Sequence, residues 1–133
     1  MKKFLSVLLI VAILCTVMIV SVSANTVVGP GGTASIEALE SQKEFTWTAK
    51  PKTNWPYNFH GTIEYINVNN GETDWSSVGG SGIMGSKVTG EASPHGLGTG
   101  TVYATLTGTA DALFGTDFVV LPGCVASQYF TNN

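Results

Sequence analysis

Beyond residue 24, apolar and polar residues alternate along the chain with a period of two, and no long window shows helical spacing. The alternating segments are rich in Thr, Val, Ile and aromatic residues, and Gly, Asn or Pro separates them, which is typical of short β-strands. Each such strand buries one face and exposes the other. The pattern predicts strands over Thr33–Leu39, Glu44–Ala49, Tyr57–Gly61, Lys87–Ala92, Thr101–Ala110, Phe118–Leu121 and Val125–Phe130.

The most specific local signal is a hairpin over Ile63–Val78, which continues the strand that starts at Tyr57. Its centre is an Asn70-Gly71 dipeptide, which tolerates the two positive φ angles of a type I′ turn. With these two residues as the loop, Ile66 lies opposite Trp75. We interpret this aliphatic–aromatic pair as the mark of a buried face.

These strands together predict an all-β domain. About seven or eight short strands in roughly 100 residues are typical of a sandwich or small barrel. We expect an antiparallel β-sandwich of Greek-key or immunoglobulin-like type, with a small barrel as the alternative. Residues 25–133 are enough for one domain and too few for two.

The segment Thr99–Thr109 has a threonine at every second position except Tyr103. In a strand these residues share one face, and the small apolar residues between them share the face toward the core. Threonine is β-branched and well hydrated, so a solvent-facing strand accounts for the row without any function. A flat ice-binding surface would need several such strands side by side, and neither Lys87–Ala92 nor Phe118–Leu121 supplies a matching row.

Self-assembly is a further interpretation of the row, since a long strand with little charge and high β-propensity favours pairing between edges. We expect the segment Thr26–Gly32 either to stay flexible or to add as a strand to the open edge of a neighbouring molecule. The residues assigned to the candidate assembly surface are Thr101, Thr105, Thr107 and Cys124.

Aromatic residues alternate with amides and an imidazole in the segment Asn54–His60. Stacked rings beside amide groups suit a neutral sugar, whereas aromatic residues at period two are more often the buried face of a strand. The core interpretation is favoured, because a small domain needs large side chains to bury enough area. The candidate ligand-binding residues are Trp55, Tyr57, His60 and Trp75.

The N-terminal residues 1–24 have the pattern of a secretory signal peptide. Two lysines precede an apolar run from Phe4 to Val20, and Ala24 follows with the small side chain that a signal peptidase requires. We therefore expect a secreted or cell-surface protein that starts at Asn25. Retention of the apolar run as an uncleaved membrane helix is the alternative, and contact with a membrane is expected only in that case.

Charge and cysteine content limit the partners. Without Lys2 and Lys3 the chain has four lysines, nine acidic residues and no arginine, hence a formal charge of −5. This balance excludes nucleic-acid binding, which depends on basic residues that neutralise phosphates. Cys124 is then the single cysteine, so it is either a small buried residue, which we favour, or paired between molecules.

The sequence contains no catalytic, cofactor-binding or metal-binding pattern of convincing spacing, so we expect a protein that is not an enzyme and uses no cofactor or metal. The leading hypothesis is an extracellular protein that acts by binding or self-assembly, as a surface or structural subunit. A carbohydrate-binding module for a neutral glycan is the alternative. A third hypothesis is an exported inhibitor or toxin that acts on a protein partner.

Overall fold

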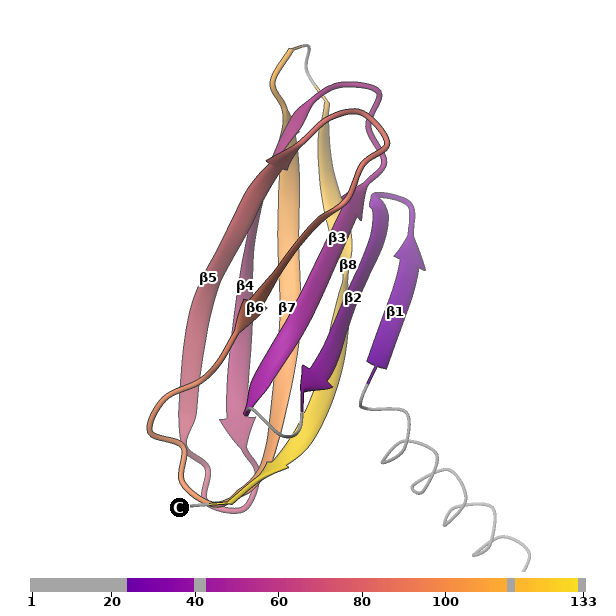
Figure 1. Cartoon of the computed structure of the whole chain (residues 1–133). Coiled ribbons are helices and arrows are strands. Elements are labelled where there is room, and N and C mark those ends of the chain that lie inside the picture. The colour runs from indigo at the N-terminus through magenta and orange to yellow at the C-terminus, as the bar shows by residue number, and fades with distance from the viewer. Residues whose placement is uncertain (1–23, 40–42, 115–116, 132–133) are drawn as a thin grey trace, which may run out of the picture.

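The computed structural model of the chain describes residues 24–39, 43–114 and 117–131, and the expected signal segment lies outside them except for Ala24. The described residues are all-β and contain no helix. Their strands run along the long axis of the molecule (Figure 1). They are β1 (Ala24–Gly29), β2 (Gly32–Leu39), β3 (Glu44–Pro51), β4 (Tyr57–Asn67), β5 (Thr73–Gly82), β6 (Val88–Ala92), β7 (Gly100–Ala112) and β8 (Phe118–Phe130).

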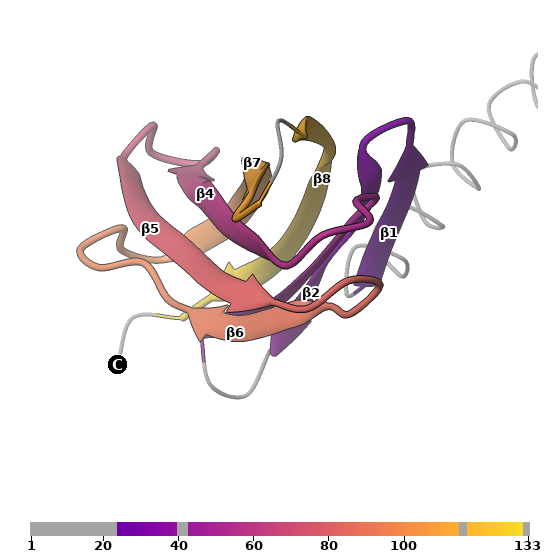
Figure 2. The ribbon, with the colours of Figure 1, turned by 90° about the horizontal axis from the view of Figure 1, so that it is seen from above.

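Two antiparallel sheets form the sandwich that the strand pattern predicts. Sheet A has the order β1-β2-β3-β6, and sheet B has the order β5-β4-β7-β8. The chain crosses between the sheets in the β3–β4, β5–β6 and β6–β7 connections. Figure 2 looks along the strands and shows the two layers, which approach each other where β8 packs against β1 and β2.

The core fills the space between the two sheets with the inward-facing residues of the alternating pattern. Aromatic rings link the layers: the centroids of Phe45 and Tyr65 lie 5.8 Å apart, and those of Trp47 and Phe59 lie 5.6 Å apart. Each pair joins a strand of sheet A to β4 of sheet B. Ring pairs of this kind add about 0.5–1.5 kcal/mol beyond the buried area, so they help to fix the layers against each other.

The N-terminal segment Thr26–Gly32 belongs to the fold of its own molecule. Most of it forms β1, which pairs with β2 from Ala24↔Glu37 to Gly29↔Gly32. Our expectation that this segment stays flexible or joins a neighbouring molecule was therefore wrong. The Pro30-Gly31 turn reverses the chain, so this segment pairs with β2 of the same molecule.

The β4–β5 hairpin forms where we predicted it, with a different register. Ile66 lies opposite Thr73, and Trp75 lies opposite Glu64. Within Asn70-Gly71, Gly71 alone adopts a positive φ angle, at 79°, so the turn is not of type I′. The last paired residues are Ile66 and Thr73, so the loop between the strands is longer than two residues. The expected pairing of Ile66 with Trp75 was therefore wrong.

The face on which Ile66 and Trp75 lie is also the opposite of the one we expected. Ile66 is 42% exposed and Trp75 is 65% exposed, so both point away from the core. The inward-facing residues of β4 are instead those of odd number, among them Ile63 and Tyr65, which are fully buried. Apolar residues occur on both faces of this strand, so alternation alone did not identify the buried one.

The last two predicted strands, Phe118–Leu121 and Val125–Phe130, are two parts of the single strand β8. Its pairing with β7 shifts register between Leu106 and Gly108, where a β-bulge absorbs the Pro122-Gly123 step. The sequence suggested a break because proline and glycine ordinarily end a strand. At a bulge they do not interrupt it.

Candidate functional site

The threonine row of β7 lies on the outer face of sheet B, as predicted. Thr101, Thr105, Thr107 and Thr109 point outward, whereas the alternate residues of β7 face the core or lie close to it. Tyr103 continues the outward row and is 38% exposed. We refer to the outward-pointing residues of β5, β4 and β7 as the outer face.

Hydroxyl groups cross the outer face from strand to strand at its centre. Thr62 of β4 lies opposite both Ser77 of β5 and Thr107 of β7. Of the two segments compared with the threonine row, Lys87–Ala92 belongs to the other sheet, and Phe118–Leu121 pairs with β7 on its other side. The hydroxyl groups that lie in line with Thr107 belong to β4 and β5 instead, and they are limited to Thr62 and Ser77.

A shallow depression lies on the outer face next to this hydroxyl row. Glu64 is placed between Trp75 on one side and Thr105 on the other. Ile66, the next outward residue of β4, lies between Thr73 and Tyr103. The residues that line the depression are Thr62, Glu64, Tyr65, Ile66, Thr73, Asp74, Trp75 and Thr105.

Asp74, which precedes Trp75 on β5, is fixed by a contact with the β6–β7 connection. Its carboxylate accepts a hydrogen bond of 2.8 Å from the backbone N–H of His95 in the β6–β7 connection. Backbone hydrogen bonds from His95 and Trp75 lower the pKa of Asp74 below its ordinary value, because they stabilise the charged form. The carboxylate thus ties the connection to the strand that carries Trp75.

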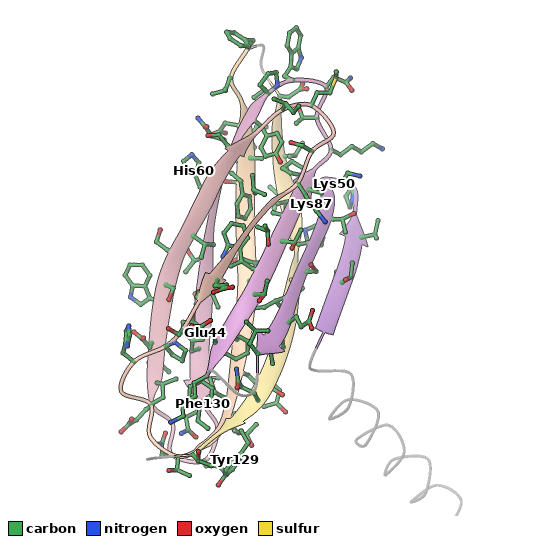
Figure 3. All side chains as sticks on the ribbon, in the orientation of Figure 1. Glu44, Lys50, His60, Lys87, Tyr129 and Phe130 are labelled. Carbon is green, nitrogen blue, oxygen red and sulfur yellow. The ribbon has the colours of Figure 1, made fainter. Side chains whose placement is uncertain are left out.

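The four predicted ligand-binding residues do not form one site. Tyr57 is fully buried, and its hydroxyl donates a 2.8 Å hydrogen bond to the carbonyl of Ser86. Trp55 is 44% exposed in the β3–β4 connection at one end of the sandwich. His60 and Trp75 share the outer face but lie toward different ends of it, His60 near the upper end in Figure 3.

The predicted assembly residues also divide between two faces. Thr101, Thr105 and Thr107 point outward, whereas Cys124 of β8 is 2% exposed and lies in the core cluster. Burial raises the pKa of the Cys124 thiol to about 11, because the apolar surroundings disfavour the thiolate. The folded protein therefore offers a poorly reactive thiol.

Sequence reasoning missed two of the three β4 residues near Trp75, Glu64 and Thr62, and it placed the third, Ile66, directly opposite Trp75. The signal was present, since these three residues alternate on β4 with the buried ones. It could be used only with the correct register of the hairpin, because a shift of two residues moves Trp75 from Glu64 to Ile66.

The part of the chain that the structure describes holds no cluster of three or more His, Cys, Asp or Glu side chains that suits a metal ion. It also holds no helix long and apolar enough to cross a membrane. In comparisons with known proteins, no family model, no curated protein and no solved structure matches the chain significantly.

Proposed function

We propose that the protein is a small secreted, non-enzymatic binding protein that recognises a neutral glycan at the depression beside Trp75. The observation that carries this proposal is Trp75, which is 65% exposed near the start of the regular strand β5, next to a carboxylate and several hydroxyls. A large aromatic side chain in that position contributes little to the core. Its exposure is explained if a ligand covers it.

The chemistry of the depression suits a sugar ring. The flat indole of Trp75 and the aliphatic side chain of the neighbouring Ile66 offer an apolar surface to the C–H groups of the ring. Glu64 accepts hydrogen bonds from sugar hydroxyls, and Thr62 and Thr105 both donate and accept them. No lysine or arginine lines the depression, so a neutral ligand fits it better than a sulfated or phosphorylated one.

Replacing Trp75 with alanine is expected to abolish binding to a neutral polysaccharide while leaving the fold intact, because the side chain is largely solvent-exposed. Binding is measured by retention on insoluble neutral polysaccharides and on an array of neutral glycans, and folding by thermal unfolding. The matched control is Tyr129→Ala, a change of similar size and exposure on β8, outside the depression.

Two outcomes of this experiment count against the glycan proposal. The first is a wild-type protein that binds none of the neutral glycans. The second is a Trp75→Ala variant that binds as well as the control variant. A large fall in the melting temperature of Trp75→Ala would contradict the exposed position of the indole.

Self-assembly is the second candidate function, and the free edge of β5 favours it. Among the described strands, β5 forms one of the two edges of sheet B, and its ten residues contain one charged side chain, Asp74, and no proline. Natural edge strands usually carry lysine, proline or a bulge that prevents pairing with another chain. A second copy of β5 that pairs antiparallel with the first would extend sheet B across both molecules.

Light scattering of the purified protein over a range of concentrations, with and without reductant, tests this second function. We expect any dimer or larger species to be insensitive to reductant, because Cys124 is buried. Ser77→Lys places a charge on the edge strand and should dissociate such species, whereas Thr107→Lys, on an inner strand of the sheet, should not. A monomer at every concentration would exclude self-assembly.

We also propose that the connections make this sandwich one of the Greek-key type, the class that includes immunoglobulin-like domains. Support comes from the position of β6, which follows β5 in the chain and lies beside β3 in the other sheet. A return of this kind is what distinguishes a Greek key from a simple succession of hairpins.

A further inference from the structure

Five large apolar side chains project from the loops at one end of the sandwich. They come from three separate connections: β3–β4, β5–β6 and β7–β8. Their exposed fractions lie between 44% and 71%, although loops and turns ordinarily carry polar residues. We call this set the apolar tip, and it consists of Trp55, Ile83, Met84, Leu113 and Phe114.

The register of sheet B brings these loops together. Tyr57, the first residue of β4, lies opposite both Gly82 of β5 and Ala112 of β7. Ile83 and Leu113 are the next residues along their chains, so they emerge on either side of the segment that precedes Tyr57. That segment contains Trp55.

Hydrogen bonds fix the loops of the tip to one another. The backbone N–H of Leu113 donates to the carbonyl of Pro56 at 2.7 Å, which joins the β7–β8 and β3–β4 connections. The hydroxyl of Tyr57 donates to the carbonyl of Ser86 at 2.8 Å, which holds the β5–β6 turn. The apolar side chains are therefore presented on loops anchored to the end of the sheet.

Positive charge gathers at the same end of the molecule. All four lysines of the chain after residue 24 lie within the described residues, and three of them, Lys50, Lys52 and Lys87, flank the apolar tip. These three side chains are exposed, and Figure 3 shows Lys50 and Lys87 toward that end. Lys43, near the opposite end, contacts the carbonyl of Thr131.

Carboxylates are distributed in the opposite way. Two of them, Asp111 and Asp117, lie near the tip, and they are outnumbered there by the three lysines. The other six in the described residues, Glu37, Glu44, Glu64, Glu72, Asp74 and Glu91, lie farther along the strands or at the other end. An acidic protein thus has one end that is apolar and locally basic.

We propose that this end docks on the surface of a lipid bilayer that contains anionic phospholipids. Apolar loop side chains enter the boundary between headgroups and acyl chains, where tryptophan is preferred, and the lysines around them contact the phosphates. The apolar groups stand on three separate loops rather than on one flat patch. A bilayer accommodates such protrusions without a matching pocket, whereas a protein partner needs one.

Docking in this way leaves the outer face of sheet B free, because its depression lies away from the tip. The β4 residues that line the depression lie between Thr62 and Ile66, in the half of the strand farther from the tip. The membrane surface is therefore separate from the proposed glycan site, and the two proposals fail or succeed independently.

The test is flotation of the exported protein, starting at Asn25, with vesicles of phosphatidylcholine alone or with about 30% phosphatidylglycerol added as the anionic lipid. We expect the protein to float with the anionic vesicles and to be released by high salt. The variant Ile83→Ser/Met84→Ser should stay at the bottom of the gradient. Lys52→Gln/Lys87→Gln should weaken binding roughly thirtyfold, about fivefold for each lysine.

Matched controls are Tyr129→Ser for an exposed apolar side chain and Lys43→Gln for a lysine, both near the opposite end of the molecule. Both should float like the wild type. Phe114→Ser provides a second tip variant in case the double serine variant does not fold. The proposal is overturned if the wild type does not bind anionic vesicles at low salt, or if the tip variants and the controls bind equally.

Discussion

Replacing Gly31 with alanine is expected to destabilise the protein by about 3 kcal/mol, the upper part of the usual range for overpacking. Gly31 lies in the β1–β2 turn, against the backbone of β8. A Cβ atom at this position would be 1.9 Å from the carbonyl oxygen of Val120 and 2.7 Å from its carbonyl carbon. Both atoms are backbone, so no change of rotamer relieves the clash.

The structural consequence extends beyond the turn. The close approach of Gly31 to Val120 is part of the contact by which sheet A and sheet B meet at β8. Relief of the clash requires β8 to move away from the turn, and Leu121, buried next to Val120, would move with it. The expected loss in the free energy of unfolding is a substantial part of the roughly 5–15 kcal/mol that stabilises a typical domain.

The measurement is equilibrium unfolding in urea, with Gly123→Ala as the matched control. Gly123 lies on the same strand as Val120, and the nearest atom to its added Cβ is 3.7 Å away, an ordinary contact. We expect the control to stay within about 0.5 kcal/mol of the wild type. Equal stability of the two variants would show that β8 does not lie against the turn as described.

The strand positions could be predicted from the sequence because alternation and turn residues are local signals. In β7 the two alternating sets differ strongly, with threonines on one side and residues such as Val102 and Leu106 on the other. The buried face of β7 was therefore identified correctly. In β4 both sets contain isoleucine, and the same reasoning chose the wrong face because it relied on the expected pairing of Ile66 with Trp75.

The pairing between strands distant in the chain could not be predicted. Neither the adjacency of β4 and β7 nor that of β3 and β6 leaves a local mark in the sequence. The candidate site depends on such pairings: Glu64 meets Thr105 only because β4 lies beside β7. The sequence thus identified Trp75 as a candidate with Ile66 near it, but not the neighbouring Glu64 and Thr62.

Asparagine side chains close the end of the sandwich opposite the apolar tip, and Asn67 is the central one. Asn67 is fully buried, and its amide nitrogen donates to the carbonyl of Leu97 at 2.7 Å and to that of Thr99 at 3.0 Å. Its side-chain oxygen accepts a 2.9 Å hydrogen bond from the backbone N–H of Asn69. One side chain thereby joins the β4–β5 loop to the β6–β7 connection.

Replacing Asn67 with leucine should therefore cost about 2–4 kcal/mol in the free energy of unfolding. Leucine has a similar volume, so the cost arises because the N–H of Asn69 and the carbonyl of Thr99, both in partly buried contacts, lose their hydrogen bonds to Asn67. We expect about 1–2 kcal/mol for each group, the lower part of the range for buried groups that lose a partner. The carbonyl of Leu97 keeps a 2.9 Å hydrogen bond from Asn70. Unfolding in urea gives the total loss.

The matched control is Asn70→Ala, which removes two hydrogen bonds from an exposed side chain of the same loop, one to Leu97 and one from Glu72. Water replaces much of what an exposed amide loses, so this change should cost less than about 1 kcal/mol. Burial of the amide, rather than the number of its hydrogen bonds, then explains the difference. Equal losses in the two variants would contradict that explanation, because Asn67 would then contribute no more than a solvent-exposed residue.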